Sequence, residues 1–315
     1  MSSPGISFGL LLQSPLARFK SRVLGGTRTI TKKDGLFREY QNHQTYAHVS
    51  KQRVEILNKY GEKLVGVLHS TGSKNLVILC HGFRSTKDEK LLLNLIAALK
   101  KEGMSAFHFD FSGNGESEGE FQYGNYRKEA DDLRAVVLNL SEKKFKICAI
   151  SGHSKGGNVV LLYASMHNDV PVIINLSGRF ALERGIDGRL GKEFMQRIKK
   201  DGFIDVKDRT GDSGFRVTEE SLMDRLTTDM RAACHAIDKE CRVLTIHGSA
   251  DEIVPSEDAF EFDKLIPNHK LHIIEGADHC YTAHQEQLAS LVLDFIKSAQ
   301  VLSFKVTREP VSSRL

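Results

Sequence analysis

The sequence predicts the α/β class, with a mostly parallel sheet of eight strands flanked by helices and a helical cap inserted between the sixth and seventh strands. Three observations indicate this. Short runs rich in Val, Ile and Leu recur from about Gln52 onward, several of them are apolar on both faces, and amphipathic segments separate them. Strands that are apolar on both faces are typical of a parallel sheet covered by helices on each side. The chain has 315 residues, 40% hydrophobic and 27% charged, which is enough to bury a large core.

Eight runs have the length and composition of strands. They are Val54–Leu57, Lys63–Leu68, Leu76–Cys80, Ser105–Phe109, Lys146–Ile150, Val172–Leu176, Val243–His247 and Leu271–Ile274. The first two lie too close together for a helical crossover, so we expect them to form a hairpin. Helices are expected where apolar side chains recur at helical spacing, at Glu89–Lys101, Tyr126–Leu140, Gly156–Met166 and Gln285–Ser298.

Residues 178–240 interrupt this alternation, because 26 of their 63 residues are charged. A disordered linker is one interpretation, but apolar residues such as Phe194, Ile198 and Leu222 give the segment a surface that can pack. We therefore expect a helical cap or lid. The domain organisation predicted is an N-terminal extension over residues 1–45, an α/β core over 46–177 and 241–302, the cap over 178–240, and a C-terminal tail over 303–315.

The strongest chemical signal is a GxSxG motif. Residues 152–157 read GHSKGG, directly after a predicted strand and before a predicted helix. This context is typical of a nucleophile elbow, a tight turn that exposes a serine in a strained conformation. Glycines are needed on both sides because the strand and the helix approach closely there. Ser154 is thus the predicted nucleophile.

A serine nucleophile needs a base and an acid that orients the base. In a fold with this elbow the chain order is serine, acid, histidine. Asp251 follows the run that ends at His247, and His279 follows the last predicted strand. Glu252 is an alternative acid, and Asp278 fits a turn residue beside the base. His153 and His247 are expected to pack beside the motifs.

The oxyanion of the tetrahedral intermediate needs two backbone donors. One comes from the residue after the nucleophile and one from the loop after an early strand. The sequence predicts the N–H groups of Lys155 and Phe83 in these positions, although His81-Gly82 is also compatible with a plain tight turn.

Several function classes are excluded. The segment DFSGNGESEG at residues 110–119 lacks the third glycine of GxGxxG and is acidic, and no GxxxxGK[ST] loop occurs, so no nucleotide cofactor is predicted. Neither CxxC nor HExxH occurs, so no metal is predicted. Of the formal net charge of +4, six positive charges lie in residues 1–33, which leaves −2 elsewhere and disfavours nucleic acid as a partner. No transmembrane segment is predicted, because no window holds 18 consecutive apolar residues.

The odd number of cysteines, five, favours buried thiols in a reducing, intracellular compartment, with a Cys234–Cys241 disulfide as the alternative. Residues 1–33 contain Arg, Lys, Ser and Thr but no acid, which is typical of a transit peptide. We therefore expect a plastid or mitochondrial location, with a disordered extension on a cytoplasmic enzyme as the alternative.

The order and separation of five motifs resemble those of the α/β-hydrolase superfamily. The motifs are HGF at 81–83, DFSGNGESEG, GHSKGG, HGSADEIVP at 247–255 and GADHCY at 276–281. Within the superfamily the chain is similar to cinnamoyl and feruloyl esterases, monoacylglycerol lipases and S33-type serine aminopeptidases, over about residues 52–300. Phe83 and Cys280 fit the cinnamoyl-esterase pattern. The resemblance implies an acyl-enzyme on Ser154, with His279 as base, Asp251 as acid, and Phe83 and Lys155 as oxyanion donors.

The expected function is therefore a cofactor-free serine hydrolase that acts on small-molecule carboxylic esters. Two other classes stay open. One is a small-molecule receptor on the same fold. The other is an acyltransferase, thioesterase or aminopeptidase that uses the same nucleophile. The sequence does not set the acyl group, the alcohol or the oligomeric state.

Overall fold

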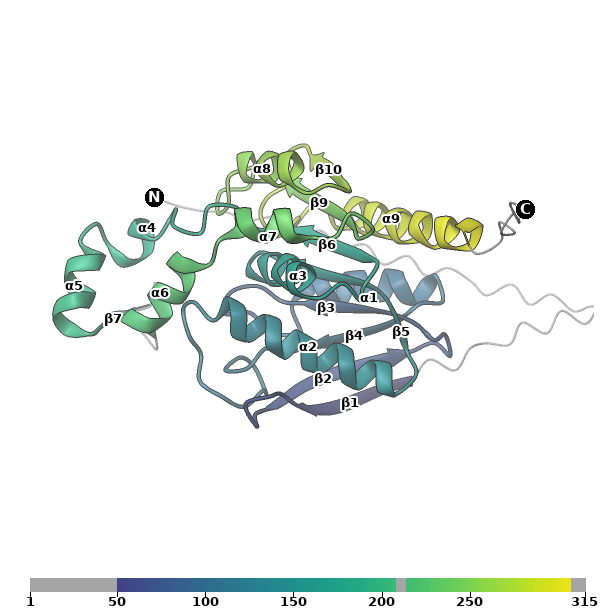
Figure 1. The fold of residues 1–315 in the computed structure, drawn as a ribbon, viewed down its shortest axis with the longest axis horizontal. Coiled ribbons are helices and arrows are strands. Elements are labelled where there is room, and N and C mark those ends of the chain that lie inside the picture. Colours follow the sequence, from purple (N-terminus) through teal and green to yellow (C-terminus); the bar gives the residue numbers. More distant parts are fainter. Residues whose placement is uncertain (1–49, 208–213, 307–315) are drawn as a thin grey trace, which may run out of the picture. The chain divides into compact units, whose positions relative to one another are not determined.

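An eight-stranded sheet forms the centre of the fold, and a computed structural model places its strands in the order β1-β2-β4-β3-β5-β6-β9-β10 (Figure 1). The structure describes residues 50–207 and 214–306, with side chains up to Val301, all within the unit that spans residues 46–315.

The strands of the sheet are β1 (Ser50–Leu57), β2 (Lys63–Ser70), β3 (Asn75–Cys80), β4 (Ser105–Phe109), β5 (Lys146–His153), β6 (Val172–Leu176), β9 (Arg242–Gly248) and β10 (His269–Ile274). Within this sheet, β2 alone is antiparallel to its neighbours, β1 and β4. The mostly parallel sheet and its first hairpin are confirmed.

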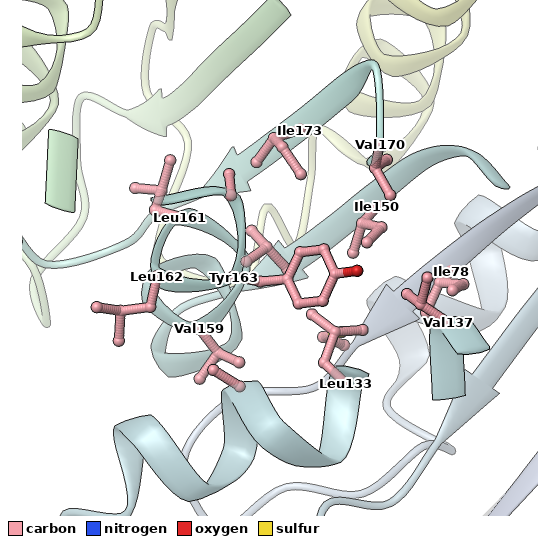
Figure 2. Close-up of a cluster of buried hydrophobic side chains, with 14 of the residues drawn as sticks. Ile78, Leu133, Val137, Ile150, Val159, Leu161, Leu162, Tyr163, Val170 and Ile173 are labelled. Atoms are coloured by element: carbon pink, nitrogen blue, oxygen red, sulfur yellow. The ribbon is translucent and has the colours of Figure 1, made fainter. Parts of the chain in front are cut away.

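Helices cover both faces of the sheet, as the two-sided apolar strands predict. One face packs against α1 (Lys90–Lys101) and α9 (Gln285–Val306), and the other against α2 (Tyr126–Glu142), α3 (Lys155–Met166) and α8 (Glu257–Leu265). Figure 2 shows part of the second layer, where Tyr163 of α3 lies among Leu133 of α2 and Ile150 of β5. Because β3, β5, β6 and β9 are covered on both sides, their ends are held firmly for the loops that follow.

The segment between β6 and β9 lies where the cap is predicted, and we refer to it as the cap. Its elements are α4 (Asp187–Leu190), α5 (Phe194–Asp201), β7 (Phe203–Val206), β8 (Phe215–Thr218), α6 (Glu219–Thr227) and α7 (Met230–Ala236). Figure 1 shows α4, α5, β7 and α6 grouped at the left. The expectation of an all-helical cap is incomplete, because β7 and β8 pair as an antiparallel hairpin. A small apolar cluster that includes Ile186, Ile198, Ile204 and Leu222 stabilises the cap.

The strand order fixes where a site can form. β3 has β4 on one side and β5 on the other, so the chain reverses its direction of winding at β3. In open parallel sheets, ligands bind at the carboxyl ends of the strands beside such a reversal. The loops after β3, β5, β9 and β10 all leave from this edge, since these strands are parallel.

The ends of several elements differ from the predicted ones. β1 begins at Ser50, four residues earlier than predicted, and α9 continues to Val306, into the segment expected as a tail. The predicted leader lies outside the described residues. All five cysteines lie within the described residues and are unpaired, and all except Cys280 are buried. In the described ranges, none of the helices combines the length and apolarity needed to cross a membrane.

Candidate active site

Ser154 lies at a strained turn between β5 and α3. Its backbone has φ 55° and ψ −118°, a conformation that L-residues other than glycine rarely adopt. The Ser154 N–H donates to the carbonyl of Leu176 over 2.7 Å, and the Ser154 carbonyl accepts from the N–H of Asn158 over 3.3 Å. The sheet and the helix therefore hold the serine backbone from both sides and project its side chain at the carboxyl edge.

The glycines around Ser154 are there because the backbones leave no room for a side chain. A Cβ at Gly152 would lie 2.1 Å from the carbonyl oxygen of Gly156. A Cβ at Gly156 would lie 2.5 Å from the carbonyl oxygen of His81, in the loop after β3. The elbow thus requires glycine at both positions, and it packs directly on the HGF loop.

Asp251 and His279 are joined by a hydrogen bond of 2.7 Å from His279 Nδ1 to Asp251 Oδ2. The other oxygen, Asp251 Oδ1, accepts from the N–H groups of Ile253 and Val254 at 2.9 and 2.8 Å. Burial raises the pKa of Asp251, but hydrogen bonds from His247, from His279 and from Val254 N–H outweigh it, so the pKa lies well below its usual range. Asp251 is therefore a fixed carboxylate that holds the His279 ring in one orientation and tautomer.

The competing acids lie elsewhere. The Asp278 Oδ1 atom accepts from the Thr282 N–H over 2.7 Å, as a turn residue does. Glu252 lines the cavity described below, and its side chain has no ion-pair partner among the described residues. Of the three carboxylates considered from the sequence, the structure thus brings Asp251 to the imidazole of His279.

His153 connects the serine to the His279 loop. Its Nε2 lies 2.9 Å from the carbonyl oxygen of His279, and the two imidazole rings lie 5.0 Å apart between centroids. In the described part of the chain, neither the Ser154 hydroxyl nor His279 Nε2 has a hydrogen-bond partner. The residue next to Ser154 therefore contacts the His279 loop, and the predicted nucleophile and the predicted base are not hydrogen-bonded to each other.

Sequence reasoning missed Glu89, which lies directly before α1. Glu89 Oε1 is 2.6 Å from Nδ1 of His153, and Oε2 accepts from Ser85 Oγ over 3.1 Å. Burial lowers the pKa of His153, but Glu89 and the carbonyl of His279 outweigh it and raise the pKa overall. Burial raises the pKa of Glu89, and its contacts with His153 and Ser85 lower it overall. The two side chains form a buried ion pair that no local sequence motif indicates.

The two predicted oxyanion donors lie near Ser154. Lys155 begins α3, and Phe83 follows Gly82, whose Cβ position lies 3.2 Å from the Cβ of Ser154. Neither backbone N–H donates to another described group, and both residues line the same cavity as Ser154. The HGF loop is held by His81, whose Nε2 accepts from Phe111 N–H over 3.1 Å, which leaves Nδ1 to donate to the Gly82 carbonyl over 2.8 Å.

A cavity of about 750 Å³ opens above Ser154, between the carboxyl edge of the sheet and the cap. The core contributes Phe83, Ser154 and Val254, and the cap contributes Arg189, Phe215 and Arg225 among others. A cavity of this size accommodates a small or medium ligand.

The acidic DFSGNGESEG segment has a structural explanation. Asp110 accepts from both the backbone N–H and the Nζ of Lys87, over 2.6 and 3.0 Å. A Cβ at Gly115 would lie 2.3 Å from Asp110 Oδ2, so this glycine lets the loop close on the buried carboxylate. Across residues 50–207 and 214–306, no group of three or more His, Cys, Asp or Glu side chains could hold a metal ion.

Comparisons with known proteins give one family and a set of esterase structures. The family described as "Serine aminopeptidase, S33" matches residues 71–232. The AB hydrolase superfamily protein YisY of Bacillus subtilis is 23% identical, covering 76% of this chain and 98% of that protein. An uncharacterized protein of Saccharomyces cerevisiae is 25% identical, covering 77% of this chain and 78% of that protein.

Among solved structures, Est1E of Butyrivibrio proteoclasticus with bound ferulic acid has a TM-score of 0.69 and 26% identity, covering 79% of this chain and 99% of that chain. An esterase of Pyrococcus furiosus has a TM-score of 0.62 and 24% identity, covering 79% and 93%. The second likeness shows the shared fold alone.

Proposed function

Because the chain belongs to the serine aminopeptidase S33 family of the α/β-hydrolase superfamily, we propose that it is a serine hydrolase that cleaves carboxylic esters through an acyl-enzyme on Ser154. The observation that carries this proposal is the Asp251–His279 hydrogen bond of 2.7 Å at the same sheet edge as a strained, cavity-lining Ser154. The likeness to Est1E with bound ferulic acid supports a carboxylic acid as the product of this site.

The proposed reaction starts with attack of Ser154 Oγ on the ester carbonyl carbon, while His279 Nε2 takes the hydroxyl proton. Asp251 stays ionised and stabilises the imidazolium that forms. The tetrahedral intermediate collapses when His279 gives this proton to the leaving alkoxide, which departs as the alcohol. Water then attacks the acyl-enzyme by the same route and releases the carboxylic acid and Ser154.

The N–H groups of Phe83 and Lys155 are the proposed oxyanion donors. Both are without a described backbone partner and lie near Ser154, so a developing negative charge there requires no rearrangement of existing hydrogen bonds. The side chain of Lys155 does not compete for the oxyanion, because its Nζ is bound to Glu129 over 2.6 Å in the core.

The ferulic acid bound to Est1E and the cavity volume of about 750 Å³ favour a small or medium acyl group. An aminopeptidase, which the family description also suggests, needs acidic side chains to bind the substrate amine. Glu252 is the single acid among the described residues that line this cavity, against several arginines. Ester cleavage is therefore the better-supported proposal.

The test is labelling with a fluorophosphonate probe, followed by hydrolysis of 4-nitrophenyl esters of increasing acyl length. We expect Ser154→Ala to lose labelling and to lower kcat/KM by at least about a thousandfold. Ser165→Ala, in the same helix with its hydroxyl bound to the Leu162 carbonyl over 2.7 Å, is the matched control and should label normally. Equal labelling and turnover in the wild type and Ser154→Ala would overturn the proposal, and binding of esters without turnover would favour a receptor.

A further inference from the structure

The described residues that line the cavity above Ser154 carry an excess of positive charge. Its described lining includes Arg84, Arg179, Arg189, Lys207 and Arg225, and one acid, Glu252. These basic groups come from separate places. Arg84 follows the HGF motif, Arg179 lies in the loop after β6, and the other three lie in α4, directly after β7 and in α6. Several cations converge on one cavity although the chain beyond residue 33 has a net charge of −2. The excess is thus a local property of this cavity.

Two of these arginines are held in place by aromatic rings rather than by carboxylates. The guanidinium of Arg189 lies 4.5 Å from the ring centroid of Phe83, and that of Arg84 lies 5.0 Å from the centroid of Phe215. The two rings contact each other edge to face at 5.6 Å. A cation–π contact orients a guanidinium and leaves its charge and its in-plane N–H donors available. In the described part of the chain, neither arginine has a carboxylate partner.

The next two arginines are anchored by carbonyl oxygens. Arg225 is 7% exposed, and its Nε and Nη2 donate to the carbonyls of Leu182 and Arg184 over 2.8 and 3.3 Å. Arg179 Nη2 donates to the carbonyl of Ile253. Carbonyls fix these side chains but do not neutralise them, and no carboxylate within the described ranges forms an ion pair with either one.

Other charges near the cavity do not cancel this excess. Lys155 is already paired with Glu129, and Asp258 and Asp251 attract Arg179 without forming an ion pair with it. Among the described arginines of the cavity, Arg225 is the buried one, and charged side chains are seldom buried without a partner of opposite charge. The arrangement fits a site whose missing counter-charge arrives with the ligand.

We propose that the ester cleaved at this site carries an anionic group, a carboxylate or a phosphate, which the guanidinium groups of the cavity hold while Ser154 attacks the carbonyl. Arginine is well suited to this because its planar fork of N–H donors matches the oxygens of either anion. The aromatic rings of Phe83 and Phe215 would contact the apolar part of the same substrate. The inference rests on the ester hydrolysis proposed above and narrows its substrate class.

The test compares esters of the same shape that differ in charge. One pair is 4-acetoxybenzoate and its methyl ester, which place the anion on the leaving alcohol. The other is monomethyl and dimethyl terephthalate, which place it on the acyl group. We expect kcat/KM of the wild type to be about tenfold higher for the anionic member of at least one pair. This preference should shrink as salt is added, since ionic strength screens the attraction.

Arg84→Gln and Arg189→Gln should each lower the anionic-to-neutral ratio about three- to tenfold, because both side chains are exposed and partly screened. Arg53→Gln, at the far edge of the sheet on β1, makes the same change in net charge and should leave the ratio as in the wild type. A wild-type ratio of one or less in both pairs, or a ratio unchanged in both cavity variants, would overturn the anionic substrate.

The two proposals fail separately in this experiment. If the wild type cleaves the neutral esters, loses this activity in Ser154→Ala, and shows no charge preference, ester hydrolysis stands and the anionic substrate is wrong. If the wild type cleaves none of the four esters and does not react with the fluorophosphonate probe, the hydrolase proposal fails, and the substrate inference fails with it.

Discussion

The carboxyl edge of the sheet and the cap line the same cavity with different kinds of side chain. The sheet edge contributes Phe83, Ser154 and Val254 to this cavity, and the hydrogen-bonded pair of Asp251 and His279 lies on loops that leave from the same edge. The cap contributes Arg189 and Arg225 from short helices that pack on a small apolar cluster. Bond-making chemistry requires positions accurate to a fraction of an ångström, whereas attraction between charges acts over a longer range. The core is therefore expected to tolerate less change than the cap.

The largest expected effect is the loss of activity when the carboxylate charge that orients His279 is removed. Asp251→Asn should lower kcat about 10³- to 10⁴-fold, because an amide in place of the carboxylate no longer holds the required tautomer or stabilises the imidazolium. The measurement is steady-state hydrolysis of a 4-nitrophenyl ester. Asp278→Asn is the matched control, since an asparagine oxygen can still accept from the Thr282 N–H, and its kcat should stay within a few-fold of the wild type. Similar losses in the two variants would contradict the assignment.

Substituting one glycine in each region tests whether the core is packed more tightly than the cap. Gly152→Ala should lower the free energy of unfolding by about 3 kcal/mol, because the new Cβ would meet the Gly156 carbonyl oxygen at 2.1 Å. Gly188→Ala in α4 meets nothing within 4 Å, so it should be neutral or stabilise by up to about 1 kcal/mol. Urea unfolding of both variants provides the measurement. A cap variant as destabilised as the core variant would remove the distinction between the two regions.

A smaller effect on the free energy of unfolding is expected when the ion pair between Glu89 and His153 is broken. This pair joins the segment after β3 to the turn at Ser154. Pairing raises the pKa of His153 above its ordinary 6.5, so its contribution to stability is full below that pH and is lost as the pH rises through the folded-state pKa. The pKa of Glu89 is lowered from its ordinary 4.5, so its contribution is present above that pH and is lost as the pH falls through the folded-state value.

Glu89→Gln should therefore lower the free energy of unfolding by about 2 kcal/mol between pH 4.5 and 6.5, and by less as the pH rises further. Urea unfolding across this pH range gives the difference from the wild type. Glu102→Gln, an exposed acid just after α1 that pairs with Lys297, should change stability by less than about 0.5 kcal/mol. A constant deficit of Glu89→Gln at all pH values would show that the pair is not ionised in the folded state.

The sequence was sufficient to place most core strands, because burial on both faces leaves a continuous apolar run that marks each strand. β4 and β6 have the predicted bounds. The start of β1 was missed because residues 50–53 lie at an exposed sheet edge, where no apolar alternation is needed. The β7–β8 hairpin was missed because four-residue strands in a charged segment give too short a pattern to distinguish from helix.

The candidate site likewise contains residues that the sequence indicated and residues that it did not. The sequence placed Ser154, Asp251 and His279 after strands that end at the same sheet edge, and the Asp251–His279 hydrogen bond agrees with that placement. Their catalytic roles stay a prediction. Glu89 could not be predicted, because it approaches His153 only through the packing of the segment before α1. The arginines of the cavity could not either, since the direction in which a cap packs is set by tertiary contacts rather than by local pattern.

The backbone conformation of Ser154 also has a thermodynamic consequence. A non-glycine residue at φ 55° and ψ −118° costs about 1–3 kcal/mol, a sizeable fraction of the net stability of a typical domain. Glycine would remove that penalty and the hydroxyl together, whereas alanine would remove only the hydroxyl. Selection for folding alone would favour glycine here. A serine at this position therefore agrees with the proposed nucleophile, for which some stability is given up in exchange for the hydroxyl.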